Sequence, residues 1–313
     1  MQQAAGDRQV EERRLHQLEK IVAVFALCAV FALTIGFAQA APKKKKGPTE
    51  DPLDQMQREH PEKVFLRSNA VLVQDAASGA TVLEKNGDVV VPIASITKLM
   101  TAMVVLDRGL DLEQRVVISG DDLDTLKGTR SRLRPGSVMA RGELMLLALM
   151  ASENRAAHAL GRAYPGGIET FVSAMNAKAQ LLGMNDSRFA DPTGLSSANV
   201  SSPRDLVKLV QAAHEYPAIR EYSTRDAATV TVQGREIAYR NTNGLVRGGT
   251  WAIGLSKTGF INEAGRCLVM RARVAGRDLV VVLLDSWGKH SRIGDANRIR
   301  KWLEATAGQR PAS

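Results

Sequence analysis

The order of apolar and polar positions divides the chain into an apolar leader, a polar stretch and a long patterned region. Ile21 to Phe37 is a continuous apolar run, and the segment from Ala41 to about Leu66 is polar, charged and contains proline. From residue 68 onward, strand patterns come first, helical spacing follows, and strand patterns return. We therefore expect one folded region over residues 68–307, a flexible segment over 41–67 and a short tail over 308–313.

The patterned region predicts a set of strands at both ends and a set of helices between them. The predicted strands cover residues 70–75, 81–83, 229–232, 251–257, 266–274 and 279–285. The first predicted helix begins at Ser95. Further helices are predicted over residues 141–150, 154–162, 168–182, 202–214 and 294–304. This order favours an α/β fold with one mainly antiparallel sheet that both chain ends build around a helical insertion.

The stretch Pro92-Ile-Ala-Ser95-Ile-Thr-Lys98 carries the first candidate chemistry. A helix beginning here places Ser95 and Lys98 on one face of its first turn. A serine hydroxyl becomes a strong nucleophile when a nearby base takes its proton, and a lysine serves as that base when its pKa is lowered. The helix N-terminus adds amide donors where an oxyanion would form.

Two further motifs follow in a fixed order. Ser152-Glu-Asn154 follows an apolar run, and Lys257-Thr-Gly259 is expected to end a strand-like run. Ser-x-x-Lys, Ser-x-Asn and Lys-Thr-Gly, in that order, form the signature of penicillin-binding proteins and class A β-lactamases. Each motif alone also fits a helix cap or a turn. The ordered set favours a catalytic site.

Composition and charge limit the classes of binding partner that the chain is expected to have. Of the 313 residues, 44% are hydrophobic. The formal charge of +9 favours binding partners that are acidic, such as anionic lipid or cell wall. Residues 1–40 contribute nothing to that charge, and no segment resembles a nucleic-acid-binding module. Lys43, Lys44, Lys45 and Lys46 begin the polar segment, where contact with membrane phosphates or acidic wall material is a hypothesis.

The leader has the features of an export signal. Its apolar run is followed by Ala38-Gln-Ala40, a small-x-small sequence typical of signal peptidase sites. We expect residues 1–40 to be a signal peptide cleaved after Ala40 and the mature protein to be periplasmic. An apolar run of seventeen residues is also compatible with the alternative that the leader stays uncleaved and anchors the protein in the inner membrane.

Cysteine and histidine usage indicates no metal or cofactor site. The five histidines are scattered, and no Cys or His cluster has metal-ligand spacing. Without the leader, Cys267 is the only thiol, and its apolar surroundings indicate a core residue.

On its motifs, the chain resembles the serine D-Ala-D-Ala peptidases, which are low-molecular-mass penicillin-binding proteins, and among them the D-alanyl-D-alanine endopeptidases. The resemblance spans about Ser68 to Ala305. Besides the three motifs, it rests on residues 93–107, 150–157, 164–167, 240–243 and 257–260. It implies a β-lactamase/transpeptidase-like fold, peptidoglycan stem peptides as substrates and β-lactams as acylating inhibitors.

The resemblance also implies catalytic roles. Ser95 would attack the carbonyl of the penultimate D-Ala and form an acyl-enzyme. Lys98 would be the base, with its pKa lowered by repulsion from the nearby Lys257. Ser152 would relay a proton to the leaving amine, and Asn154 would bind a substrate amide.

The same resemblance implies the remaining contacts with substrate. Lys257, Thr258 and Gly259 would hold the carboxylate or carbonyl end of the peptide. The backbone amides of Ser95 and Phe260 would form the oxyanion hole.

Alternative functions remain open at this stage. A D-Ala-D-Ala carboxypeptidase would use the same residues, and none of them reports which leaving amine is preferred. A β-lactamase would share the motifs but needs fast deacylation. A non-catalytic peptidoglycan-binding protein would rely on the positive charge alone.

Overall fold

The computed structural model describes residues 52–60 and 63–307. Its centre is a five-stranded sheet in the order β2-β1-β11-β10-β9, with every neighbouring pair antiparallel. The strands are β1 (Ser68–Asp75), β2 (Thr81–Lys85), β9 (Ala252–Ile261), β10 (Gly265–Val274) and β11 (Arg277–Ser286). Strands from both chain ends therefore meet in one sheet, as the sequence predicts.

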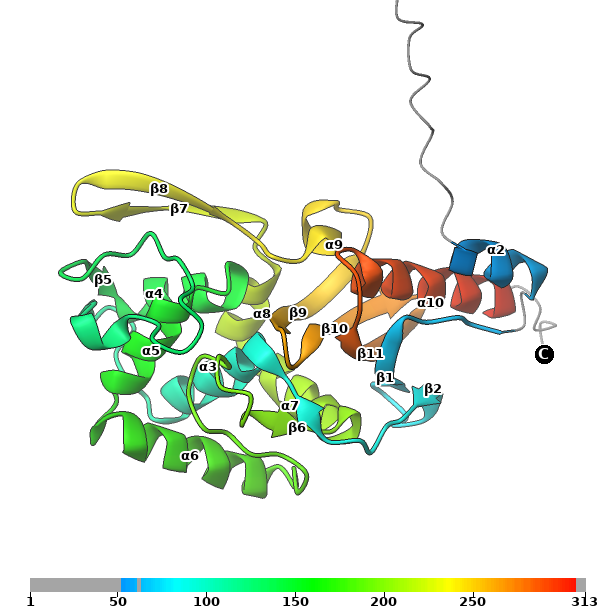
Figure 1. Cartoon of the computed structure of the whole chain (residues 1–313), viewed down its shortest axis with the longest axis horizontal. Helices are drawn as coiled ribbons and strands as arrows, with labels where there is room; N and C mark the ends of the chain where they lie inside the picture. Colours follow the sequence, from blue (N-terminus) through cyan, green and yellow to red (C-terminus); the bar gives the residue numbers. More distant parts are fainter. Residues whose placement is uncertain (1–51, 61–62, 308–313) are drawn as a thin grey trace, which may run out of the picture. The chain divides into compact units, whose positions relative to one another are not determined.

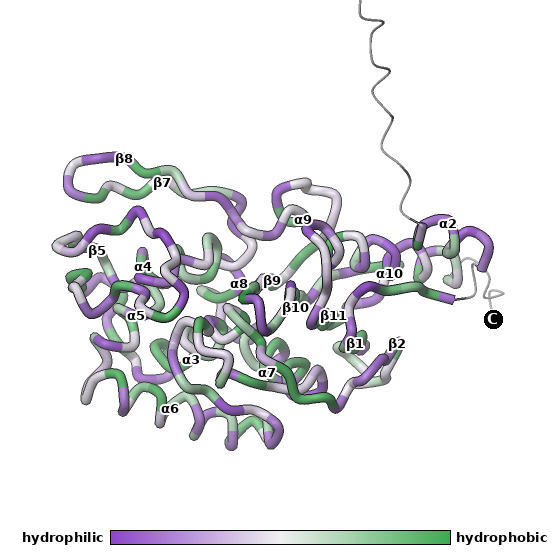
Figure 2. The backbone as a smooth tube through the Cα atoms, viewed as in Figure 1, coloured by the Kyte–Doolittle hydropathy of each residue, from purple (hydrophilic) through white to green (hydrophobic). Residues whose placement is uncertain are grey.

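Both faces of this sheet are buried, because side chains alternate between two apolar clusters. On β1, Leu72 belongs to the larger cluster, whereas Val71 belongs to the smaller one. The smaller cluster packs under helix α10 (Ser291–Ala307), which contributes Ile299 and Leu303. Figure 1 shows α10 on one side of the sheet and most of the other helices on the opposite side, and the strand interiors are largely hydrophobic in Figure 2.

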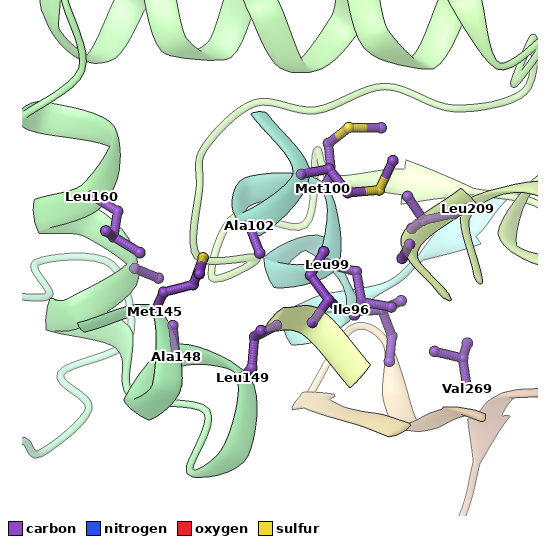
Figure 3. Packing of buried hydrophobic residues seen from close by; sticks show 14 of the residues in the cluster. Ile96, Leu99, Met100, Ala102, Met145, Ala148, Leu149, Leu160, Leu209 and Val269 are labelled. Atoms are coloured by element: carbon purple, nitrogen blue, oxygen red, sulfur yellow. The ribbon is translucent and has the colours of Figure 1, made fainter. Parts of the chain in front are cut away.

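The helical part of the chain packs around one central helix, α3 (Thr97–Asp107), which follows the 3-10 turn η1 (Ala94–Ile96). Residues 97–105 of α3 are all buried, so this helix is enclosed on every side. Figure 3 shows its Leu99 and Met100 among side chains from several neighbouring elements. The neighbouring helices are α4 (Arg141–Met150), α5 (Asn154–Arg162), α6 (Gly167–Leu181), α7 (Pro203–His214) and α8 (Pro217–Thr224).

Small elements complete the helical part. They are the strands β3 (Val91–Pro92), β4 (Arg115–Val117), β5 (Val138–Ala140) and β6 (Val200–Ser201), the 3-10 turn η2 (Gly120–Asp122), the hairpin β7 (Ala227–Val232) and β8 (Arg235–Arg240), and the short helix α9 (Gly244–Arg247). β3 pairs with β6, and β4 pairs with β5. Within the described ranges, no helix has the length and apolarity that crossing a membrane requires.

Besides the small elements β3 to β6 and η2, which were not predicted, the structure differs from the sequence-based expectation in three places. The Lys257-Thr-Gly259 motif lies inside β9 and not at its end, because the strand continues to Ile261 along β10. The second strand of the β7–β8 hairpin and the helices α8 and α9 were not anticipated.

The third difference lies within the segment expected to be flexible, where residues 52–59 form helix α2 (Pro52–Glu59). Asp54 accepts a 3.0 Å hydrogen bond from Arg298 of α10, which ties α2 to the folded region by a contact that local sequence cannot reveal. The predicted signal peptide, the lysines at 43–46 and the tail at 308–313 lie outside the described residues.

Candidate active site

Ser95 lies on the η1 turn and Lys98 lies one turn further on, in α3. Ser95 is only 9% exposed and Lys98 is completely buried. The turn begins with Ala94 at a positive φ of 47°, a conformation that costs energy for any residue with a side chain. The neighbouring structure must hold this turn in place, and it presents the Ser95 hydroxyl to the lysine.

The Lys98 amine has three polar neighbours. Nζ lies 2.7 Å from Ser95 Oγ, 2.8 Å from Asn154 Oδ1 and 2.6 Å from the carbonyl oxygen of Thr193. A neutral amine has two N–H donors and one lone pair. Because the amide and carbonyl oxygens only accept, they take both N–H groups, and the lone pair is left for the Ser95 hydroxyl proton.

Burial lowers the Lys98 pKa from 10.5 to about 7, while the carboxylates of Asp191, Glu153 and Asp124 act in the opposite direction. Burial is therefore the main cause of the lowered pKa of Lys98, and repulsion from Lys257 as a contributor stays a prediction. The pKa of Lys257 itself is lowered well below its usual value, first by burial and then by the charges of Lys98 and Arg292. Removal from water is the largest cause that prepares Lys98 to act as a base near neutral pH.

Ser152 and Asn154 lie at the turn between α4 and α5. Ser152 has a positive φ of 59°, and its Oγ accepts a 2.9 Å hydrogen bond from Lys257 Nζ. Asn154 bonds to Lys98 through Oδ1 and donates from Nδ2 to Thr129 Oγ1 at 3.0 Å. The residue at the N-cap of α5 is Glu153, and its side chain makes no capping bond. The helix-cap alternative therefore does not account for Ser152 or Asn154.

Strand β9 brings the third motif to the same place. Lys257 is 1% exposed, and its Nζ also donates to the carbonyl oxygen of Thr258 at 2.8 Å. A Cβ atom at Gly259 would lie 2.9 Å from the Ile93 carbonyl oxygen and 3.1 Å from the Ser95 nitrogen. A side chain at residue 259 would therefore separate β9 from the turn that carries Ser95.

A cleft of about 410 Å³ opens above these residues. Of the predicted site residues, Ser95, Ser152, Asn154, Thr258, Gly259 and Phe260 line it. The remaining lining residues are Lys127, Thr129, Leu195, Thr242, Ile261, Asn262 and Arg292. Lys98 and Lys257 lie beneath the cleft wall, each with its amine on a lining serine. The three motifs thus form one surface, while the oxyanion-hole role of the Ser95 and Phe260 amides stays a prediction.

The 191–199 loop, which belongs to none of the three motifs, is part of the environment of Lys98. Its Thr193 carbonyl accepts from Lys98. Asp191 shapes the loop by accepting from the backbone nitrogens of Thr193 at 2.6 Å, Gly194 at 2.8 Å and Ser196 at 3.0 Å. The string Asp191-Pro-Thr-Gly-Leu195 indicates a tight turn in the sequence, but nothing in it reveals which carbonyl faces Lys98.

Thr242 is the second residue that the motifs did not assign. Its Oγ1 lies 2.6 Å from Thr258 Oγ1, and its backbone nitrogen donates to the carbonyl oxygen of Met150. Thr242 therefore joins the end of α4 to β9, the elements on either side of the cleft.

Potential metal ligands and the free thiol are the remaining candidates for chemistry. Among residues 52–60 and 63–307, no group of three or more His, Cys, Asp or Glu side chains is placed to hold a metal ion. Cys267 is fully buried, and burial raises its pKa to about 11, which confirms it as a core residue.

Comparisons with known proteins agree with this geometry. Residues 55–288 match the model of the peptidase S11 family, described as D-alanyl-D-alanine carboxypeptidase. Relatives described as D-alanyl-D-alanine endopeptidases are 48% identical in Pseudomonas aeruginosa and 46% identical in Escherichia coli, each over 76% of this chain and 78% of the relative. The crystal structure of the Streptomyces K15 DD-transpeptidase is 28% identical, covers 78% of this chain and 99% of that one, and superposes with a TM-score of 0.72. The chain therefore belongs to the peptidase S11 family of D-alanyl-D-alanine peptidases.

Proposed function

We propose that this protein is a serine D,D-endopeptidase that hydrolyses the D-Ala–diamino acid cross-links of peptidoglycan through an acyl-enzyme on Ser95. The observation that carries the proposal is the 2.7 Å contact between Lys98 Nζ and Ser95 Oγ at the base of the cleft. A buried lysine with a pKa of about 7, in contact with a serine hydroxyl, is a base and nucleophile pair.

Acylation follows from these positions. The neutral Lys98 takes the Ser95 proton as Oγ attacks the D-Ala carbonyl carbon, and the carbonyl oxygen becomes an oxyanion. The backbone N–H groups of Ser95 and Phe260 stabilise that charge. As the tetrahedral intermediate collapses, the C–N bond breaks and Ser152 relays the proton that Lys98 has taken to the departing amine, so Ser152 keeps a hydroxyl proton and Lys98 returns to its neutral form.

Deacylation uses the same groups. A water molecule attacks the ester carbonyl carbon, Lys98 accepts its proton, and the ester bond to Ser95 breaks as Oγ regains a proton. The free carboxylate of D-Ala then leaves the cleft.

Lys257 and Thr258 differ in whether substrate in the cleft can contact them. Thr258 lines the cleft, so its hydroxyl can reach a substrate carboxylate directly. Lys257 is buried and donates to Ser152, so it acts by orienting that hydroxyl and by the positive potential it adds when protonated. Asn154 binds Lys98 through Oδ1 and lines the cleft, where its amide is available to the peptide backbone.

The endopeptidase assignment rests on the relatives. The relatives at 48% and 46% identity are described as endopeptidases, whereas the carboxypeptidases of Streptomyces and Bacillus subtilis are 31% and 28% identical. Carboxypeptidase activity is the second candidate, because the family description itself names it.

The deciding experiment incubates purified protein and its Ser95→Ala variant with cross-linked muropeptide dimers and analyses the products by mass spectrometry. Conversion of dimers to monomers by the wild type alone supports the endopeptidase. Loss of terminal D-Ala without dimer cleavage supports the carboxypeptidase. Rapid, complete turnover of penicillin would instead indicate a β-lactamase, and the absence of both cleavage and a penicillin adduct would contradict catalysis.

Export to the periplasm is part of the proposal. It is supported by the apolar run Ile21–Phe37 and by Ala38-Gln-Ala40 after it. Cell fractionation with N-terminal sequencing tests it: a periplasmic chain that begins at Ala41 supports cleavage, whereas a chain that begins at Met1 in the inner membrane supports an anchor.

The proposal also includes the lysines at 43–46, which contact anionic groups of the wall or the membrane. Substitution of all four lysines by glutamine would weaken this contact.

A further inference from the structure

Two basic segments lie against each other beyond the cleft. The first, residues 125–136, connects η2 to β5, and the second, residues 225–240, contains the β7–β8 hairpin. They contact each other where the Arg132 guanidinium covers the Tyr239 ring at 3.7 Å and donates to the Ala238 carbonyl oxygen at 2.6 Å. Figure 1 shows the hairpin running alongside this connection, and both carry many hydrophilic residues in Figure 2. We call these two segments the arginine arm.

The arginine arm is continuous with the cleft. Thr129 lines the cleft and is followed directly by Arg130. Thr242 also lines the cleft, and Arg240, the last residue of β8, lies two positions before it. Each segment therefore has an exposed arginine within two residues of a threonine that lines the cleft.

The charges of the arm are mostly not neutralised. The two segments contain seven basic residues and two acidic residues, Asp226 and Glu236. Two of the basic side chains have partners: Arg132 on Tyr239, and Lys127 in an ion pair with Glu263 at 2.5 Å. Among residues 52–60 and 63–307, no acidic side chain forms an ion pair with the exposed arginines of the arm, which are Arg130, Arg134, Arg225, Arg235 and Arg240.

We propose that the arginine arm binds the carboxylates of the peptidoglycan strand that carries the scissile cross-link. This inference rests on the proposed function. A cross-link joins two stem peptides attached to two glycan strands, a substrate too large for a cleft of about 410 Å³. The parts outside the cleft carry free carboxylates, and the planar guanidinium group matches a carboxylate with two parallel hydrogen bonds.

The arm thus provides a second binding region for polymeric substrate. Small acylating molecules such as penicillin fit in the cleft and do not reach it. Because the contacts are exposed, they favour capture and orientation of an anionic polymer and weaken as salt rises.

The test measures binding of the catalytically inactive Ser95→Ala protein to purified, insoluble peptidoglycan. The arm variant adds R130Q, R134Q and R240Q, and the matched control adds R108Q, R188Q and R273Q. The control removes the same charge from exposed arginines outside the arm. We expect the arm variant to bind about tenfold more weakly, with a smaller dependence on salt, and the control to bind as the parent does. Equal binding by all three proteins, or equal weakening in both variants, would overturn the proposal.

Chemical modification identifies the recognised group. Peptidoglycan whose carboxylates have been converted to amides should bind the parent and the arm variant equally. A difference that persists on this material would overturn carboxylate recognition. A loss of binding to anionic phospholipid vesicles, with peptidoglycan binding intact, would assign the arm to membranes instead.

Two measurements separate this inference from the proposed function. In proteins that retain Ser95, the rate of acylation by penicillin should be the same with and without the arm substitutions, and a matching loss of acylation would show a damaged cleft and overturn the arm's separate role. The dimer-cleavage assay tests the endopeptidase itself. A protein that fails this assay but still shows arm-dependent binding retains the arm and loses only the proposed reaction.

Discussion

Lys98 combines complete burial with three polar contacts, and this combination determines how activity depends on pH. With a pKa of about 7, the amine is mostly protonated below that pH and has a free lone pair above it. Only the neutral form can take the Ser95 proton. We therefore expect the rate of acylation by penicillin to rise with pH through a midpoint near pH 7. A rate that stays flat across this range, or falls, would exclude Lys98 as the base.

Glu153 should shift that midpoint. Its carboxylate is nine-tenths buried and raises the pKa of Lys98, in opposition to burial. Glu153→Gln removes this charge, so Lys98 should lose its proton more easily and the midpoint should move to lower pH. The measurement is the same acylation profile, recorded beside Asp121→Asn. Asp121 is exposed and is not among the carboxylates acting on Lys98, so its variant should keep the parent midpoint. A shift to higher pH in Glu153→Gln would contradict the assignment.

At the residue scale, side-chain chemistry could be predicted and backbone chemistry could not. Ser95, Lys98 and Asn154 were identified because their side chains recur in a motif with fixed order. Thr193 contributes a carbonyl oxygen, which every residue has, so only the path of the loop singles it out. Ser197-Ala-Asn199 has the same pattern as the second motif, but Asn199 donates to the Asp191 carboxylate at 2.6 Å and supports the loop.

At the scale of single elements, the loop that contains Gly194 determines where Ser95 lies. Gly194 has a φ of +79°, and a Cβ atom there would lie 2.0 Å from the Ala94 carbonyl oxygen. Gly194→Ala must therefore displace the η1 turn. Since misplacing a reacting group by about 1 Å can cost roughly 100-fold in rate, we expect penicillin acylation to fall by about that factor.

Gly183→Ala is the matched control for this prediction. Gly183 also has a positive φ, +67°, but a Cβ atom there would have no heavy atom within 4 Å. Its variant should lose about 1–2 kcal/mol of unfolding free energy from backbone strain and keep its acylation rate. Equal rates in the two variants would mean that the approach of Gly194 to Ala94 does not position the nucleophile.

The success of prediction also varied among elements. The predicted bounds of α4 and α5 agree with the structure, because continuous apolar spacing and the turn between them mark both helices. The strand β8 was missed because its sequence, Arg235–Arg240, has three charged residues and only partial alternation. It is stabilised by pairing with the adjacent β7 and by Arg132 on Tyr239, and the contact with Arg132 comes from a residue distant in sequence.

At the scale of the whole molecule, the order of strands and helices was sufficient to predict the central sheet. β1 and β11 are separated by about two hundred residues, yet Val71 lies opposite Leu283 in the antiparallel register. Apolar runs at both ends can be buried on both faces only if they share one sheet with helices on each side. The order of the strands within the sheet depends on pairing and was not predicted.

One buried carboxylate joins the two ends of the chain and gives the last prediction. Asp295 of α10 is fully buried and accepts from the backbone nitrogen of Ser68 at 2.7 Å, from its hydroxyl at 2.6 Å and from Arg298 Nη2 at 2.6 Å. Asp295→Asn removes the fully buried carboxylate from Arg298, while the pair with the partly exposed Asp54 remains. Losing one member of a buried ion pair costs about 3 kcal/mol, which for a domain of this size lowers Tm by roughly 10 °C.

The control for this variant is Asp278→Asn, which breaks an ion pair with Arg271 on the same sheet. The Asp278 side chain is 36% exposed, so water replaces the lost contact and the cost should be at most about 1 kcal/mol. Thermal unfolding followed by circular dichroism compares the two variants, and penicillin acylation well below Tm should be unchanged in both. Similar Tm values would mean that α10 is held to β1 by apolar packing alone. A large difference with intact acylation would show that Asp295 joins the chain ends without contributing to the chemistry of Ser95.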